Sequence, residues 1–133
     1  MQELNEVYTQ TAEPRVLEAS RRLARAVVES VQFQKYEQAN QRLRRDATAQ
    51  QLLFEYQQAQ QKFQMRQSWG GVSGQAANRI VELQEQVFSN SILKDYFQAQ
   101  EDLVQMLMEL NALLNENLGF DFASLAKPAG GCC

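Results

Sequence analysis

The spacing of apolar residues constrains this chain most, because they recur every three to four positions in five separate segments. That period places apolar side chains on one face of an α-helix, whereas a half-buried strand requires strict alternation, which no segment shows. Glutamine, alanine, leucine, arginine and glutamate are abundant in the sequence, and this mixture favours helices. We therefore expect an all-α protein with about five helices and no β-sheet.

Capping residues divide the first half of this pattern. Pro14 suits the first turn of an opening helix, and the stretch "ESVQF" predicts a short break before a second helix. Asp46 is a predicted N-cap, because its carboxylate can accept the free amide hydrogens of a long third helix. The glycines of "SWGGVSG" permit the backbone angles of a turn, so we expect the third helix to end there.

Capping and stop residues also predict the helix boundaries in the second half of the chain. Ser73 is the expected cap of a shorter fourth helix, and "SNS" precedes a long last helix from about Ile92 to Leu118. Gly119 is a good helix stop, after which Phe120 can fold back in a Schellman arrangement.

A chain of 133 residues is long enough to form one domain with an apolar core. We assign residues 1–12 to a flexible N-terminal segment, 13–119 to the helical domain and 120–133 to a flexible C-terminal tail. The long third and last helices cannot bury their full apolar faces on the two shorter partners. The remaining surface favours a helical bundle formed with a second copy over a compact monomer.

The composition excludes several classes of function. The chain contains no histidine, which removes Ser-His-Asp triads, Cys-His pairs and HExxH zinc sites, and "WGGVSG" lacks the Lys-Ser/Thr of a phosphate loop. We expect no enzymatic activity and no small-molecule substrate. No run of about 18 apolar residues exists to cross a membrane, and the polar first residues lack secretory features, so we predict a cytoplasmic protein.

Charge is unevenly distributed, although the net charge is only -3. Residues 14–45 carry a net charge of about +5, either as solvated helix faces or as a docking surface for an acidic protein or an RNA backbone. Arg22, Arg25 and Arg45 are the candidate partner-binding residues in this region. Trp69, which precedes two glycines, is either a partner anchor or a hinge or core plug.

Cys132 and Cys133 are the only cysteines, and they are adjacent. A disulfide between neighbours is strained, and two thiolates do not complete the four ligands that zinc or an iron-sulfur cluster needs. A second copy or a partner protein would have to supply the others. The alternatives are a disordered end without function and a double-prenylation signal.

Several stretches resemble the YlbF/YmcA/YheA family of small bacterial regulators. They are "ESVQFQKYEQA" with Asp46 soon after it, "SNSILKDYFQAQEDL", and the cysteine-bearing end, which is similar to that of YlbF-like members. The resemblance covers about residues 20–133. It implies a YheA/YmcA-like antiparallel helical bundle with two long helices, no catalytic activity and a tendency to dimerise.

The resemblance also implies a function. Family members act as accessory factors in a cytosolic complex with YaaT that affects RNase Y-dependent mRNA maturation, and thereby competence, biofilm formation and sporulation. Cysteines of several subunits are associated there with iron-sulfur clusters, which makes Cys132 and Cys133 the matching positions, although fuller tails contain further cysteines that this chain lacks. There are two alternative hypotheses for the function. The first is a metal- or redox-responsive sensor that uses these cysteines, and the second is an unrelated coiled-coil scaffold. Direct contact of the basic helices with RNA stays an open question.

Overall fold

The computed structural model describes residues 13–71 and 74–128, which form helices and turns with no strand among them. The six described helices are α2 (Pro14–Glu29), α3 (Val31–Arg45), α4 (Ala47–Ser68), α5 (Gly74–Ser89), α6 (Ser91–Leu118) and α7 (Phe122–Leu125). The prediction of an all-α chain with two long helices is confirmed, since α4 has 22 residues and α6 has 28. The short helix α7 was not predicted from the sequence.

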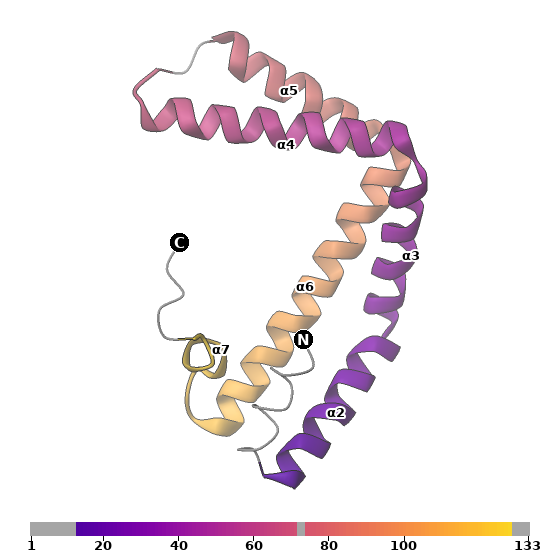
Figure 1. Cartoon of the computed structure of the whole chain (residues 1–133), viewed down its shortest axis with the longest axis vertical. Coiled ribbons are helices and arrows are strands. Elements are labelled where there is room, and N and C mark those ends of the chain that lie inside the picture. The colour runs from indigo at the N-terminus through magenta and orange to yellow at the C-terminus, as the bar shows by residue number, and fades with distance from the viewer. Residues whose placement is uncertain (1–12, 72–73, 129–133) are drawn as a thin grey trace.

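The helices form two antiparallel pairs that meet at a corner (Figure 1). One pair consists of α3 and α6, and the other consists of α4 and α5, which leave the corner in a different direction. α2 extends from the end of α3 that is far from the corner. The chain therefore has two arms rather than one compact bundle.

A predicted break and a predicted cap set the first helix boundaries. Ser30 is extended between α2 and α3, and its hydroxyl oxygen accepts a hydrogen bond from the amide of Phe33 at 3.2 Å. The Asp46 carboxylate accepts from the amide of Ala49 at 2.8 Å and begins α4. A cap of this kind stabilises a helix by about 1 kcal/mol, so both helix boundaries are specified locally.

The "SNS" cluster caps α6 through its central residue. The Asn90 side-chain oxygen accepts hydrogen bonds from the amides of Ile92 and Leu93, both at 3.1 Å. The predicted cap of α5, Ser73, lies outside the described residues.

The end of α6 differs in detail from the prediction. Gly119 takes a left-handed φ of 77°, as expected for a helix stop, and its amide donates to the Asn115 carbonyl at 2.8 Å. This is the simpler left-handed cap, because Phe120 does not add the bond that a Schellman arrangement requires. The Asn115 side chain instead accepts from the amide of Phe122 at 2.8 Å and holds α7 to α6.

Asp121 caps α7. Its carboxylate accepts hydrogen bonds from the hydroxyl of Ser124 at 2.7 Å and from the Ser124 amide at 3.2 Å. These bonds favour the ionised carboxylate, and therefore the pKa of Asp121 is lower than usual.

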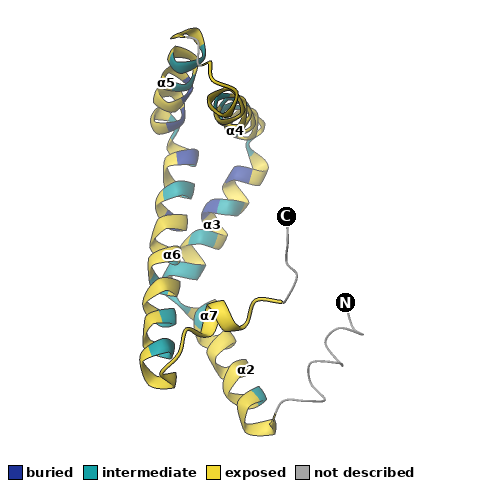
Figure 2. Ribbon diagram, turned by 90° about the vertical axis from the view of Figure 1, so that its left-hand side faces the viewer, coloured by how far each residue is buried: buried dark blue, intermediate teal, exposed yellow. Residues whose placement is uncertain are grey.

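The apolar core lies at the corner, where four helices meet. Its buried members are Leu43, Ala49, Val87 and Leu93, one from each of α3 to α6. Partly buried residues surround them: Leu52, Leu53, Tyr56, Ile92, Tyr96 and Phe97. Figure 2 shows that burial is concentrated towards this corner, whereas α2 and α7 are mostly exposed.

Beyond the corner, α3 and α6 pack through small and aromatic residues. Ala39 and Ala99 are both buried, and the rings of Tyr36 and Tyr96 lie 5.8 Å apart. Burial, reinforced by the neighbouring Tyr36 hydroxyl, raises the pKa of Tyr96. This contact joins α3 to the first half of α6 and leaves the second half largely uncovered.

Candidate interaction surface

The described residues expose more large apolar side chains than they bury. Only seven hydrophobic residues are buried, and three of these are alanines: Ala39, Leu43, Ala49, Leu83, Val87, Leu93 and Ala99. Seventeen larger hydrophobic residues are exposed, from Val16 on α2 to Leu125 on α7. The prediction that the long helices leave apolar surface uncovered is confirmed. Contiguous groups of exposed apolar side chains are typical of surfaces that bind another molecule.

One uncovered region is the second half of α6, residues 104–118, which we call the α6 end. Leu113 is 56% exposed and Leu118 is 46% exposed. Acidic residues accompany them, because residues 104–118 contain Glu109 and Glu116 and neither lysine nor arginine. The α6 end is therefore both apolar and acidic.

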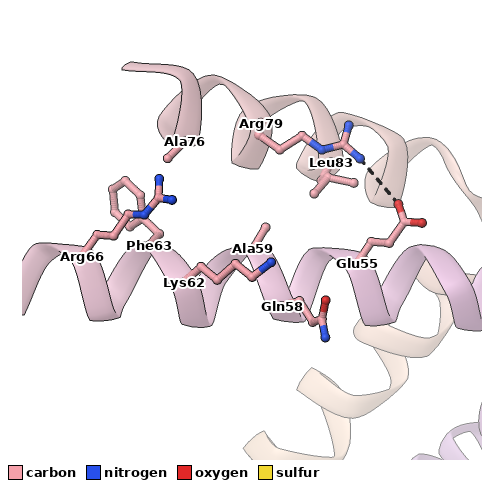
Figure 3. Close-up of a pocket in the computed structure, with 9 residues that line it drawn as sticks. All are labelled: Glu55, Gln58, Ala59, Lys62, Phe63, Arg66, Ala76, Arg79 and Leu83. Carbon is pink, nitrogen blue, oxygen red and sulfur yellow. Dashed lines mark ion pairs between the residues drawn. The ribbon is translucent and has the colours of Figure 1, made fainter. Parts of the chain in front are cut away.

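A second region lies on the other arm, between α4 and α5 (Figure 3). A groove of about 260 Å³ opens there, which we call the α4–α5 groove. Its apolar surface comes from both helices, and charged or polar side chains border it. The lining residues are Glu55, Gln58, Ala59, Lys62, Phe63, Arg66, Ala76, Arg79 and Leu83.

The border of the groove is basic. The Arg79 guanidinium lies 3.6 Å from the Glu55 carboxylate and 3.6 Å from that of Glu82, so its charge is compensated within the chain. Lys62 and Arg66 form no ion pair with any residue of the described ranges. Their spacing of four places them on one face of α4, on either side of the turn that carries Phe63. Two uncompensated cations beside an apolar floor suit an acidic, amphipathic ligand.

The three arginines predicted as partner-binding residues do not form one cluster. Arg22 and Arg25 are exposed on α2, whereas Arg45 is the last residue of α3 and lies near the corner. The 15 residues of α3 separate these positions, a length of about 22 Å. They are spread along α2 and α3, and we call these three residues the basic strip.

Trp69 ends α4, next to Gly70, which takes a left-handed φ of 89°. Its side chain is 89% exposed, so it is not a core plug. It stands at the tip of the α4–α5 arm, where it is free to contact a partner.

The remaining candidates, Cys132 and Cys133, lie outside the described residues. Within the described ranges, no group of three or more cysteine, aspartate or glutamate side chains is placed to hold a metal ion. No described helix combines the length and hydropathy that a membrane span needs.

The α4–α5 groove was not predicted from the sequence. Lys62 and Arg66 fall outside the basic region of residues 14–45, and Arg79 contributes from a different helix. A signal was present in the stretch "KFQMR", which places two cations one helical turn apart around an aromatic residue.

Comparison with known proteins gives consistent results. The family described as control of competence regulator ComK, YlbF/YmcA, matches residues 16–119. A UPF0342 protein of Desulfitobacterium hafniense (strain Y51) is 28% identical over 119 residues, which are 89% of this chain and 86% of that protein. Among solved structures, Bacillus subtilis RicA in complex with RicF matches with a TM-score of 0.68 and 16% identity, over 81% of this chain and 96% of the other. At that identity the likeness shows the fold.

Proposed function

This chain belongs to the YlbF/YmcA family, and from that premise we propose that it is a non-enzymatic helical adaptor that acts by binding other proteins. The observation that carries the proposal is the imbalance between seven buried and seventeen exposed hydrophobic residues in the described part of the chain. Burial of one leucine or phenylalanine side chain contributes about 1.5–3 kcal/mol, so a partner that covers a few of them gains substantial binding free energy.

The fold is compatible with such a function. RicA, which has a similar fold, was crystallised in complex with a second protein, RicF. The two arms of this chain offer separate surfaces, which allows one molecule to contact two proteins at once. An adaptor needs that property, whereas an enzyme needs an enclosed site with converging reactive groups.

We extend the proposal to the partners. One is a second copy of the chain, and the others are YaaT-like and RNase Y-like proteins in the cytoplasm. The consequence would be regulation of mRNA processing, and through it competence, biofilm formation and sporulation. The description of the matching family, which names control of competence, supports this choice. The exposed cations Arg22, Arg25 and Arg45 would contact an acidic surface of such a partner.

The cysteines fit the same proposal as ligands of an iron-sulfur cluster. Thiolate is the ligand that these clusters require, and a cluster takes four. Cys132 and Cys133 would supply two, and another subunit would supply the rest.

Affinity capture from the native host, followed by mass spectrometry, tests the adaptor function. We expect recovery of YaaT-like and RNase Y-like proteins with the unmodified chain. A variant with Arg22→Glu, Arg25→Glu and Arg45→Glu should recover less of them while its circular dichroism stays helical.

The matched control replaces the same three arginines by lysine, which keeps the charge and should keep capture. Recovery of neither partner by the unmodified chain would contradict the proposal and favour an unrelated scaffold. Equal capture by the glutamate variant would exclude the basic strip as the contact.

A further inference from the structure

We propose that two copies of this chain pair reciprocally, with the α6 end of each copy lying in the α4–α5 groove of the other. The inference rests on the proposed function, because it specifies one of the protein contacts through which the adaptor assembles. The two faces of that contact carry opposite charges.

The groove supplies an apolar floor and a positive border. Phe63 and Leu83 line it from opposite helices, while Lys62 and Arg66 stand at its edge without ion-pair partners in the described chain. Such a groove fits a helix whose outer face combines carboxylates with an apolar residue.

The α6 end has that composition. Glu109, Leu113 and Glu116 are spaced by four and three residues, which places them on one face of the helix. All three are exposed, and neither carboxylate forms an ion pair within the described ranges. The two carboxylates are separated by about 10 Å along the helix axis, with the leucine between them.

One chain cannot make this contact with itself. The α4–α5 pair leads away from the corner, and the α6 end lies at the opposite end of the other arm (Figure 1). Between Leu93 in the corner core and Glu109, the helix rises by about 24 Å. The two faces must therefore find their partners on another molecule.

A second copy is favoured over an unrelated acidic protein because one chain carries both faces. In a twofold arrangement each copy offers one groove and one α6 end, so two equal contacts form at once. The arrangement also covers apolar surface on both arms of both copies. A polyanion such as RNA would match the groove but would leave the acidic α6 end unpaired.

Charge reversal tests the pairing in the full-length protein. The groove variant carries Lys62→Glu and Arg66→Glu, and the helix variant carries Glu109→Lys and Glu116→Lys. All four side chains are exposed, so we expect both variants to fold, which circular dichroism verifies. By analytical ultracentrifugation the unmodified chain should be dimeric, and each variant alone should dimerise at least tenfold more weakly.

Mixing the two variants gives the sharpest result. In a mixed dimer, the reversed groove meets the reversed helix, and the unchanged groove meets the unchanged helix. We therefore expect the equimolar mixture to form a dimer, and the chain with all four changes to recover self-association. The charge-conserving variant with Lys62→Arg and Arg66→Lys should behave like the unmodified chain.

The outcomes separate this inference from the proposed function. If the unmodified chain stays monomeric, or the mixture fails to associate, the reciprocal pairing is wrong, while capture of partner proteins still decides the adaptor function. Loss of a different protein or of RNA from the groove variant, with the dimer intact, would also overturn the pairing. A mixed dimer together with weakened single variants supports it.

Discussion

Replacement of Leu93 by alanine should destabilise the whole fold, because this residue joins the two arms. Its side chain is 0% exposed and belongs to the corner core with Leu43, Ala49 and Val87. Truncation of a fully buried leucine typically costs about 2.7–5.0 kcal/mol, since the lost contacts leave a cavity that closes only partly. A small domain has only about 5–15 kcal/mol of stability in total, and this one has few other buried residues to compensate.

The expected loss converts into a measurable shift of melting temperature. A chain of this length has an unfolding entropy of about 0.28 kcal/mol/K, so a loss of about 3 kcal/mol lowers the Tm by roughly 10 °C. Thermal melts followed by circular dichroism at one fixed protein concentration give this value, and urea titration provides an independent estimate.

Leu125→Ala is the matched control, because it makes the same chemical change on a side chain that is 74% exposed. We expect its effect to stay within about 0.5 kcal/mol. If both variants melt at the same temperature, the corner core does not hold the arms together, and the stability must arise elsewhere.

Three further predictions concern single groups. Asp46→Ala should lower the free energy of unfolding by about 1 kcal/mol in urea titrations, whereas Asp46→Asn should retain most of it because the amide oxygen can still cap α4. The pKa of Asp121 is lowered in the folded chain, so its cap on α7 stabilises at pH values above the ordinary aspartate pKa and is lost as the pH falls through the lowered value. An NMR titration of the Ser124 amide should show this transition, and Asp121→Asn should abolish it; an amide shift that ignores pH would contradict it. Protein purified without oxygen together with its partners should contain iron and sulfide and absorb visible light, and replacement of Cys132 and Cys133 by serine should remove both signals; equal iron content in the serine variant would refute ligation by these cysteines.

Helix boundaries could be predicted from the sequence because capping is a local interaction. The Asp46 side chain needs only the amide of the next turn, and the break before Phe33 needs only Ser30. Both signals lie within four residues of the boundary that they set, so no knowledge of the tertiary fold was required.

The arrangement of the helices could not be predicted in this way. The angle between the arms depends on how Leu43, Ala49, Val87 and Leu93 pack together, and these residues come from four helices. The α4–α5 groove likewise combines side chains from two helices, so its cations were not recognised as a group. The helix α7 depends on a hydrogen bond from Phe122 to Asn115, seven residues away, which periodicity does not report.

The small corner core has a consequence for the life of the protein in a cell. A chain with so few buried residues in its described core should spend more time in partly unfolded states, which proteases and chaperones recognise. Copies that have not yet been assembled should therefore be degraded faster than assembled ones. The steady-state amount of this chain should then rise and fall with the amount of the proteins that it assembles with.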